Sequence, residues 1–499
     1  MAQAAAGQAG QAVALPRRVL QPQLRAGTLA ADPDPFAACL DPQRVAVVAD
    51  PACLSRQEVA ELGALARAFG VSLLLVGDAE LAAEQEAALL LPAGRAAPPL
   101  APSAAGPPIR AVTLHRVALP LRTLYVSALY VRRTQPRLVV EIELADGTRG
   151  FGEAPGGEDV ARLLAPLARS WLGRDPLAER GLLRRDFARI GFANRNGRAG
   201  LAAFAALDLA AWDAAARLLG RPLAALLGAE GPPPPLPIAA PLPAAVPPAG
   251  EEERSALHRH MADAANAARI ADLAEEMAGR GGITAFKWKS PGQDIGWDEA
   301  AIAALRRRLG PDVRLRHDPN AAFGTEAALA LARRLLPYGL EFLEDPADGL
   351  EALARLARQL PLPIATNMAI LSPADLAARY RLGAGPAVVL GDLSYWGGVL
   401  GLADMAFVCR RIGLVPALHS FYETAVATAA HAHLAAALGL AAVHPMDCGT
   451  PGLAADVVPE GVLRISKGRL QVPDGPGLGL VPDAALLRRL ATAEPERIP

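Results

Sequence analysis

Six short polar segments recur between residues 286 and 420: Phe-Lys-Trp-Lys (286–289), His-Asp-Pro-Asn (317–320), Leu-Glu-Asp-Pro (343–346), Ala-Thr-Asn-Met (365–368), Gly-Asp-Leu (391–393) and Leu-His-Ser (418–420). Their charged or amide residues lie 23 to 29 residues apart. Each interval holds one helix-like apolar pattern and one short apolar run. This is the repeat of a TIM-type (β/α) barrel, in which each strand ends in a functional residue at one rim. The sequence therefore predicts an α/β fold whose polar side chains converge on one mouth.

Length, composition and charge limit the kind of protein this is. The chain has 499 residues and is 52% hydrophobic, so it can bury a large core, and its length predicts more than one domain. A net charge of −1 gives no reason to expect a nucleic-acid partner or binding to an anionic membrane surface. The four cysteines lack metal-ligand spacing, which favours a reduced, cytoplasmic protein. No apolar run reaches the roughly 18–20 residues of a membrane span.

Changes in composition divide the chain into six predicted segments. They are a disordered segment (1–44), a small βαβ-like extension of unknown role (45–91), a Pro/Ala-rich linker (92–108), an α+β domain (109–230), the barrel (231–459) and a turn-rich C-terminal segment (460–499). Within the barrel, residues 236–242 are expected to form the first strand. The polar run 251–260 that follows is expected to be a solvated insertion.

Two lysines, Lys287 and Lys289, lie two residues apart in a predicted strand, so both point to the same side. The outer face of a barrel strand carries apolar residues, so this side is the lumen. We expect the two positive charges to repel, which lowers a lysine pKa and favours a neutral amine that can take a proton from carbon. The alternative for an isolated Lys-x-Lys pair is an edge strand that faces solvent.

Three oxygen-bearing side chains, Asp318, Glu344 and Asn367, end three successive predicted strands. Carboxylate and amide oxygens with incomplete charge neutralisation suit Mg²⁺, which keeps positions open for water or substrate. Taken singly, Asp318 could belong to a plain turn and Glu344 to a helix start. Their occurrence at successive repeats favours a metal site.

Asp392 and His419 end the next two predicted strands. A carboxylate beside an imidazole fixes its tautomer and raises its pKa, which makes a competent acid or base. A lone histidine would more often be a core residue, as we expect for His317, which alternation points away from the lumen. A lysine and a histidine on opposite sides of a metal-bound carboxylate indicate proton abstraction from the carbon next to that carboxylate.

The chain from about residue 109 to 485 resembles the enolase superfamily and, within it, the glucarate dehydratase branch. Besides the segments already quoted, the resemblance rests on Gly-Glu-Ala-Pro-Gly-Gly-Glu (152–158), on Trp396 after Asp392, and on Pro-Gly-Leu-Gly (476–479). It implies a modified (β/α)₇β barrel, a capping α+β domain to which the C-terminal segment returns, and one Mg²⁺. An asparagine as the third metal ligand points to this branch.

The same resemblance implies roles for single residues. Asp318, Glu344 and Asn367 would bind the metal. Lys289 would be the base on one face of an acid-sugar substrate, and His419, oriented by Asp392, would serve the other face and help the β-hydroxyl leave. Lys287 and Asn320 would stabilise the enediolate. The product would be a 4-deoxy-5-keto sugar diacid, and a homo-oligomer is expected.

The sequence departs from the family in the residues that surround the substrate. Ala239–Pro243, Phe421–Glu423 and Asp447–Gly449 stand where the family has aromatic, asparagine-rich and histidine-bearing stretches. Substrate contacts are therefore predicted from Ser420 and from arginines of the capping domain. These arginines are Arg195 and Arg198, with Arg132 and Arg133 as further candidates.

Three functions follow as hypotheses. The first is Mg²⁺-dependent dehydration of a glucarate-like acid sugar. The second is racemisation or epimerisation of a hydroxy acid by the same two bases. The third is a barrel that binds a sugar acid or a protein partner without turnover, although binding alone does not require the lysine pair or the histidine.

Overall fold

A computed structural model describes residues 45–49, 72–76, 106–178, 198–248 and 263–499. The first two of these ranges are strands β1 (Val45–Ala49) and β2 (Ser72–Val76), which pair in parallel. The helix expected between them lies outside the described residues, as do the segment 1–44, most of the linker and the insertion 251–260.

Eight parallel strands form a barrel, and the strand expected to come first, 236–242, is confirmed. Strands β6 to β12 pair in chain order, and β13 pairs back with β6, which brings the last strand beside the first. The strands are β6 (Leu236–Leu242), β7 (Ala285–Lys289), β8 (Arg314–Asp318), β9 (Phe342–Glu344), β10 (Ile364–Thr366), β11 (Val388–Gly391), β12 (Val415–Leu418) and β13 (Met446–Asp447).

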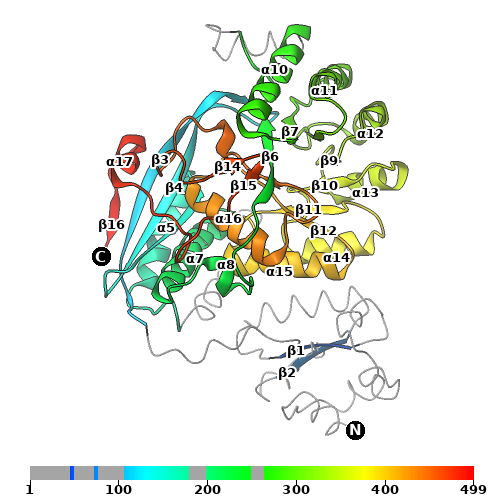
Figure 1. Cartoon of the computed structure of the whole chain (residues 1–499). Helices are drawn as coiled ribbons and strands as arrows, with labels where there is room; N and C mark the ends of the chain where they lie inside the picture. Colours follow the sequence, from blue (N-terminus) through cyan, green and yellow to red (C-terminus); the bar gives the residue numbers. More distant parts are fainter. Residues whose placement is uncertain (1–44, 50–71, 77–105, 179–197, 249–262) are drawn as a thin grey trace.

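Seven helices alternate with these strands, so the predicted (β/α)₇β architecture is confirmed; Figure 1 shows several of them on the outside of the barrel. They are α10 (Ala264–Gly281), α11 (Ile295–Leu309), α12 (Thr325–Leu335), α13 (Leu350–Gln359), α14 (Pro373–Arg381), α15 (Gly398–Arg411) and α16 (Ala425–Leu438). Side chains cap several of their N-termini: Asp263 accepts a hydrogen bond at the start of α10, and Thr424 does so at the start of α16.

Alternation along the strands sorts apolar from functional side chains. On β7, Trp288 packs outward into a cluster with Phe286 and Leu315, while Lys287 and Lys289 point into the lumen. Part of the lumen is filled by a separate apolar cluster. It consists of Phe342, Ala365, Val388, Leu390 and Ala417. The barrel interior is therefore packed rather than open, and its polar side chains gather at one mouth.

A four-stranded antiparallel sheet in the order β16-β3-β4-β5 forms the capping domain (Figure 1). Its strands are β3 (Ile109–Val126), β4 (Val131–Leu144), β5 (Arg149–Pro155) and, from the C-terminus, β16 (Glu496–Ile498). The helices of this part of the chain are α5 (Glu158–Trp171), α7 (Arg198–Leu218), α8 (Leu223–Leu226) and α17 (Ala484–Leu490).

Helix α7 packs closely on β5. A side chain at Gly152 would overlap the backbone of Ala206, so glycine there allows the helix to approach the strand. Among the described helices, α7 is long and apolar enough to cross a membrane by length and composition, but most of it is buried within the protein, the pattern of a core helix.

Short elements complete the described chain. They are η4 (Leu336–Tyr338), η5 (Thr450–Gly452), β14 (Ile465–Ser466) and β15 (Arg469–Leu470). Strand β15 pairs antiparallel with the start of β6, so the C-terminal segment runs past the barrel before it reaches the capping sheet.

Candidate active site

Six of the predicted site residues of the barrel lie at the carboxyl ends of strands. Lys289, Asp318 and Glu344 are the last residues of β7, β8 and β9. Three more follow their strands directly: Asn367 after β10, Asp392 after β11 and His419 after β12. Parallel strands of a barrel end at the same rim, so the fold gathers these residues at one mouth.

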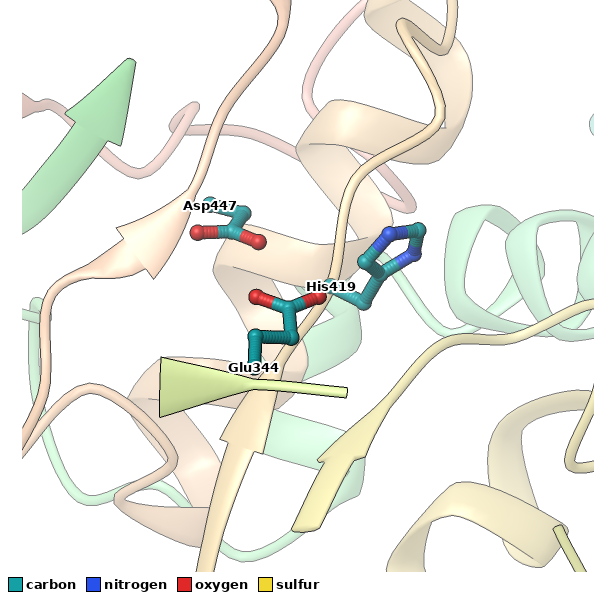
Figure 2. A group of neighbouring side chains, drawn as sticks. All are labelled: Glu344, His419 and Asp447. Atoms are coloured by element: carbon teal, nitrogen blue, oxygen red, sulfur yellow. The ribbon is translucent and has the colours of Figure 1, made fainter. Parts of the chain in front are cut away.

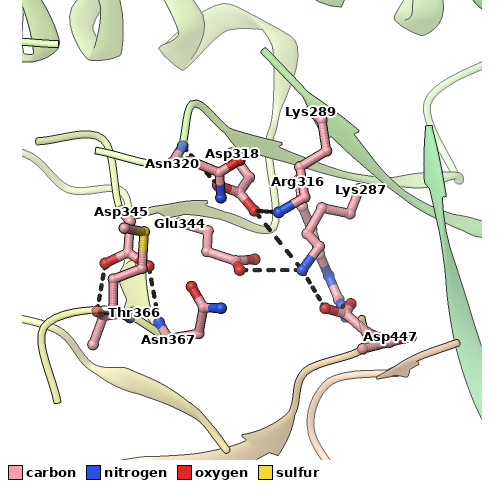
Figure 3. Close-up of polar contacts among 12 residues, drawn as sticks. Lys287, Lys289, Arg316, Asp318, Asn320, Glu344, Asp345, Thr366, Asn367 and Asp447 are labelled. Carbon is pink, nitrogen blue, oxygen red and sulfur yellow. Dashed lines mark hydrogen bonds and ion pairs between the residues drawn. The ribbon is translucent and has the colours of Figure 1, made fainter. Parts of the chain in front are cut away.

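Ion pairs join the two lysines to the carboxylates (Figure 3). Lys289 Nζ donates to Asp318 Oδ2. Lys287 Nζ lies 3.1 Å from Glu344 Oε1, is farther from Asp318 at 3.9 Å, and donates to Asp447 Oδ2. All five side chains are buried, so each charge depends on its neighbours for stabilisation.

The expectation of a neutral amine is wrong for Lys287. Burial disfavours its charged form, but the carboxylates of Asp447, Glu344 and Asp318 outweigh burial and raise the pKa of Lys287 above its ordinary value. The repulsion between the two lysines is therefore smaller than the attraction of the acids around them. Lys287 is an ammonium ion in this site, suited to stabilising negative charge.

The predicted metal ligands leave two buried oxygen atoms without partners. Glu344 Oε2 and Asn367 Oδ1 have no hydrogen-bond partner among the described residues, and Figure 3 shows the Asn367 amide beside the Glu344 carboxylate. An unpaired buried acceptor costs about 1–3 kcal/mol, and more if it is charged. Burial and the Asp318 carboxylate raise the pKa of Glu344, so the site favours an added positive charge.

The Asp318 carboxylate completes this oxygen set. Burial opposes its ionisation, but Lys289 and Lys287 outweigh burial and lower the pKa of Asp318. Two carboxylates and an amide oxygen on successive strands are the donors that a hard divalent cation such as Mg²⁺ prefers. The residues therefore fit the predicted metal.

Asp345 and Thr366 position Asn367, a pair that the sequence analysis did not single out. Asp345 accepts hydrogen bonds from the Asn367 backbone N–H at 2.8 Å and from the Thr366 hydroxyl. It does so from a left-handed backbone conformation, with φ of 38°. Burial raises the pKa of Asp345 to about 7. The only sequence signal was that Asp345 follows a candidate ligand.

The expected pair of Asp392 and His419 is not formed. Asp392 Oδ1 accepts a hydrogen bond from the Tyr395 backbone N–H at 2.9 Å, and His419 Nδ1 is buried without a partner among the described residues. The imidazole packs edge-on against Phe421, with ring centroids 4.2 Å apart. Asp392 therefore supports the loop after β11 rather than the histidine.

The pKa of His419 is also shifted opposite to the expectation. Burial lowers it well below its ordinary value, and the positive charges of Lys287 and Lys289 lower it further. Burial raises the pKa of Asp392 to about 7, so this acid cannot supply the fixed negative charge that would hold an imidazolium. His419 is therefore a neutral imidazole, able to accept a proton.

The remaining four predicted site residues lie in different surroundings. The Asn320 backbone N–H donates to Asp318 Oδ1 at 2.9 Å, so this residue lies in the site and orients a candidate ligand. The Ser420 hydroxyl donates to Glu423 and accepts from the Gly449 N–H, so it orders the loop after β12, and its contact with a substrate stays a prediction. Arg198 is exposed at the start of α7. Arg195 lies outside the described residues.

Asp447, the last residue of β13, is the acid that the sequence analysis noted only as a departure from the family. Ligand atoms of Glu344, His419 and Asp447 lie within 4.8 Å of one another (Figure 2). Asp447 Oδ1 also pairs with Arg316 Nη1 at 2.7 Å. The position of the residue at the eighth strand end was the signal that could have identified it.

Aromatic side chains gather near the oxygen set. The Tyr125 ring lies 4.8 Å from that of Tyr422 and 5.8 Å from that of Tyr130. Burial raises the pKa of Tyr125, and the charges of Asp318 and Glu344 add to this effect. Two guanidinium groups lie over tyrosine rings. That of Arg132 is 3.9 Å from the Tyr130 ring centroid, and that of Arg198 is 5.1 Å from the Tyr395 ring centroid.

Glu153 of β5 joins the capping domain to the barrel. Its carboxylate pairs with Arg137 Nε at 2.5 Å and accepts from the backbone N–H groups of Thr424 at 2.9 Å and Ala427 at 3.1 Å. These N–H groups belong to the start of α16, just after the loop that carries His419. The acidic residue in the quoted Gly-Glu-Ala-Pro segment is therefore a clamp between the two domains.

Comparison with known proteins agrees with this architecture. Residues 109–228 match the mandelate racemase / muconate lactonizing enzyme N-terminal domain, and residues 269–486 match the family described as enolase C-terminal domain-like. A solved enolase from Thermobispora bispora, complexed with magnesium and formate, has a TM-score of 0.68 and 32% sequence identity. It covers 77% of this chain and 92% of its own.

Two curated relatives show different activities. A probable glucarate dehydratase of Streptomyces coelicolor is 32% identical over 381 residues, which span 70% of this chain and 83% of the relative. An N-succinylamino acid racemase of an Amycolatopsis species is 33% identical over 201 residues, spanning 40% of this chain and 54% of the relative. With both domains matched and the barrel complete, the chain belongs to the enolase superfamily.

Proposed function

We propose that the protein is a Mg²⁺-dependent dehydratase of an acid sugar, which removes the proton next to a carboxylate and expels the β-hydroxyl as water. The observation that carries the proposal is the order of groups around the mouth. An amine on β7 (Lys289) and an imidazole after β12 (His419) flank the oxygen set on β8 to β10. A carboxylate bound at those oxygens would have a base on either side.

Asp318, Glu344 and Asn367 would hold the Mg²⁺. When bound, the ion would polarise the substrate carboxylate and stabilise the negative charge that develops on it. Lys287, already an ammonium ion, would stabilise the same charge from the β7 side. Asn320 would keep Asp318 oriented through its backbone N–H.

The proton steps follow from the state of His419. As a neutral imidazole it accepts the α-proton, and the electrons of the broken C–H bond form a carbon–carbon double bond. The resulting imidazolium then donates that proton to the β-hydroxyl as the C–O bond breaks, so water leaves. The enol that remains tautomerises to a keto acid. Lys289 would serve substrates whose α-proton faces the other side.

The choice of lysine supports an acid/base role. The chain has only three lysines among its 50 basic residues, and two of them are Lys287 and Lys289. Arginine, which the chain uses almost everywhere else, cannot lose its proton in a protein, whereas lysine can. A barrel that only bound its ligand would have no such need for lysine, which weighs against the non-catalytic hypothesis.

Racemisation or epimerisation is the second candidate. Bases on both flanks of the oxygen set would allow a proton to leave from one face and return to the other. The similarity to an N-succinylamino acid racemase also favours it. The dehydratase comes first because the relative that shares more of the chain is a probable glucarate dehydratase and because Asn367 stands as the third oxygen donor.

A panel of aldonates and aldarates with Mg²⁺ tests the proposal. We expect one or more members to give a keto acid, detected as a semicarbazone, with loss of one water. Solvent deuterium entering the α-carbon without loss of water would favour the second candidate, and neither change across the panel would refute both.

Variants then test the two bases. Lys289→Met and His419→Asn should each lower kcat about 10²- to 10⁴-fold on the substrate that uses that base. Lys467→Met, a change to the one lysine outside the site, is the matched control and should retain activity. Full activity in both site variants would contradict the assignment.

A further inference from the structure

Asp447 is a buried acid with both of its oxygens occupied. Its Oδ2 accepts from Lys287 Nζ, and its Oδ1 pairs with Arg316 Nη1 at 2.7 Å. The side chain is almost completely buried. Because each oxygen faces a cation and the side chain is buried, Asp447 is suited to holding other residues in place.

Arg316 fixes the position of Asp447. Its Nε pairs with Glu341 Oε2 at 2.6 Å, and its Nη2 donates to the Pro445 carbonyl at 2.8 Å. Its guanidinium also lies 4.7 Å from the centroid of the Phe342 ring. Since the planar guanidinium is held on three edges and on its face, it can hold Asp447 in one place.

Lys287 lies between Asp447 and the candidate metal ligands (Figure 3). On one side it donates to Asp447, and on the other its Nζ is 3.1 Å from Glu344 Oε1 and 3.9 Å from Asp318 Oδ2. An ammonium ion without Asp447 would move toward the two remaining carboxylates. There it would neutralise the charge that a divalent cation needs.

We propose that Asp447, fixed by Arg316, is a positioning residue that draws the Lys287 ammonium toward β13 and so leaves Glu344 and Asp318 available to a divalent cation. This inference rests on the proposed function only in assigning those carboxylates to Mg²⁺. In the alternative assignment, Glu344, His419 and Asp447 are the three direct ligands, and Asp447 binds the ion itself.

Mg²⁺ binding to the full-length protein without substrate, measured by titration calorimetry, tests the inference. Asp447→Asn keeps the shape of the side chain and removes its charge, and should weaken Mg²⁺ binding about 10- to 100-fold, the usual effect of losing a group that orients a metal site. In the Lys287→Met background the competing ammonium is gone. The double variant Lys287→Met/Asp447→Asn should therefore bind Mg²⁺ within about threefold of Lys287→Met.

Glu341→Gln is the matched control. It removes another carboxylate, a partly buried one, that pairs with Arg316, and the described contacts of Glu341 do not include Lys287. It should lower stability but change the Mg²⁺ dissociation constant less than about threefold. If Asp447→Asn does not fold, the comparison of the double variant with Lys287→Met still decides the question.

Three results would overturn the inference. Equal Mg²⁺ binding by the wild type and Asp447→Asn would do so and leave the proposed function intact. A double variant that binds about tenfold more weakly than Lys287→Met would identify Asp447 as a direct ligand. No Mg²⁺ binding by the wild type would reject the metal site of the proposed function together with this inference.

Discussion

Glu153 joins the capping domain to the barrel, and we expect its substitution by glutamine, Glu153→Gln, to cause a large loss of stability. The glutamine keeps the shape of the side chain but removes the negative charge that faces Arg137 and the start of α16. The Glu153 and Arg137 side chains are 0% and 1% exposed, so water cannot replace the lost partner. Arg137 Nη1 already lacks a hydrogen-bond partner among the described residues, and Glu153 is the ion-pair partner of this cation there.

The magnitude follows from these contacts. Removing one partner of a buried ion pair costs about 3–5 kcal/mol, because the other charge is left uncompensated. Losing an anion at a helix N-terminus adds about 0.3–1 kcal/mol. We therefore expect Glu153→Gln to lower the free energy of unfolding by about 4 kcal/mol. We also expect lower activity, because the loop that carries His419 leads directly into α16.

Urea unfolding followed by far-UV circular dichroism measures the loss. Glu158→Gln is the matched control: Glu158 pairs with Arg116 at 2.7 Å but is 64% exposed, so its loss should cost less than about 1 kcal/mol. A loss below about 1 kcal/mol for Glu153→Gln, equal to that of the control, would refute the reasoning that this pair joins the domains.

Two further predictions concern charge in the site. Burial raises the pKa of Asp392 to about 7, above its unfolded value of about 4, so the folded state binds the extra proton and stability falls as the pH rises from 4 to 7. Asp392→Asn removes this loss. The free energy of unfolding measured in urea should therefore be higher for the variant than for the wild type by a few kcal/mol at pH 8 but not at pH 4. A constant difference between the two pH values would contradict the assignment. Mg²⁺ at about 100 times its dissociation constant should stabilise the wild type by about 2.7 kcal/mol, and chelation should reverse the gain. Glu344→Gln should abolish that stabilisation in a thermal melt, and an unchanged response to Mg²⁺ would exclude Glu344 as a ligand.

The sequence predicted the structure correctly where a local pattern controls it. The spacing of Lys289, Asp318 and Glu344 predicted three strand ends, and the structure has each residue as the last of its strand. Alternation predicted that Lys287 and Lys289 share the lumen side, because successive side chains of a strand point to opposite faces. These inferences depend on the backbone alone, which a repeated motif specifies well.

The sequence did not predict side-chain pairs between residues that are far apart along the chain. The partners of Asp447 lie 131 and 160 residues away along the chain, and a spacing rule for neighbouring strands cannot pair them. The proposed contact of Asp392 with His419 failed for a related reason. Both residues are placed at the rim by their strands, but Asp392 turns to the Tyr395 N–H of its own loop. Strand order gives proximity, whereas side-chain orientation decides the contact.

The balance of charge in the barrel mouth supports the kind of substrate proposed. The buried groups that pair with one another there are three cations and three carboxylates: Lys287, Lys289, Arg316, Asp318, Glu344 and Asp447. Their charges balance, and burial together with the Asp318 carboxylate raises the pKa of Glu344. A divalent cation would make the mouth positive, and the negative charge of a substrate carboxylate would reduce that excess. Because uncompensated charge is costly in a buried site, the substrate carboxylate should bind more strongly with the metal ion in place than without it.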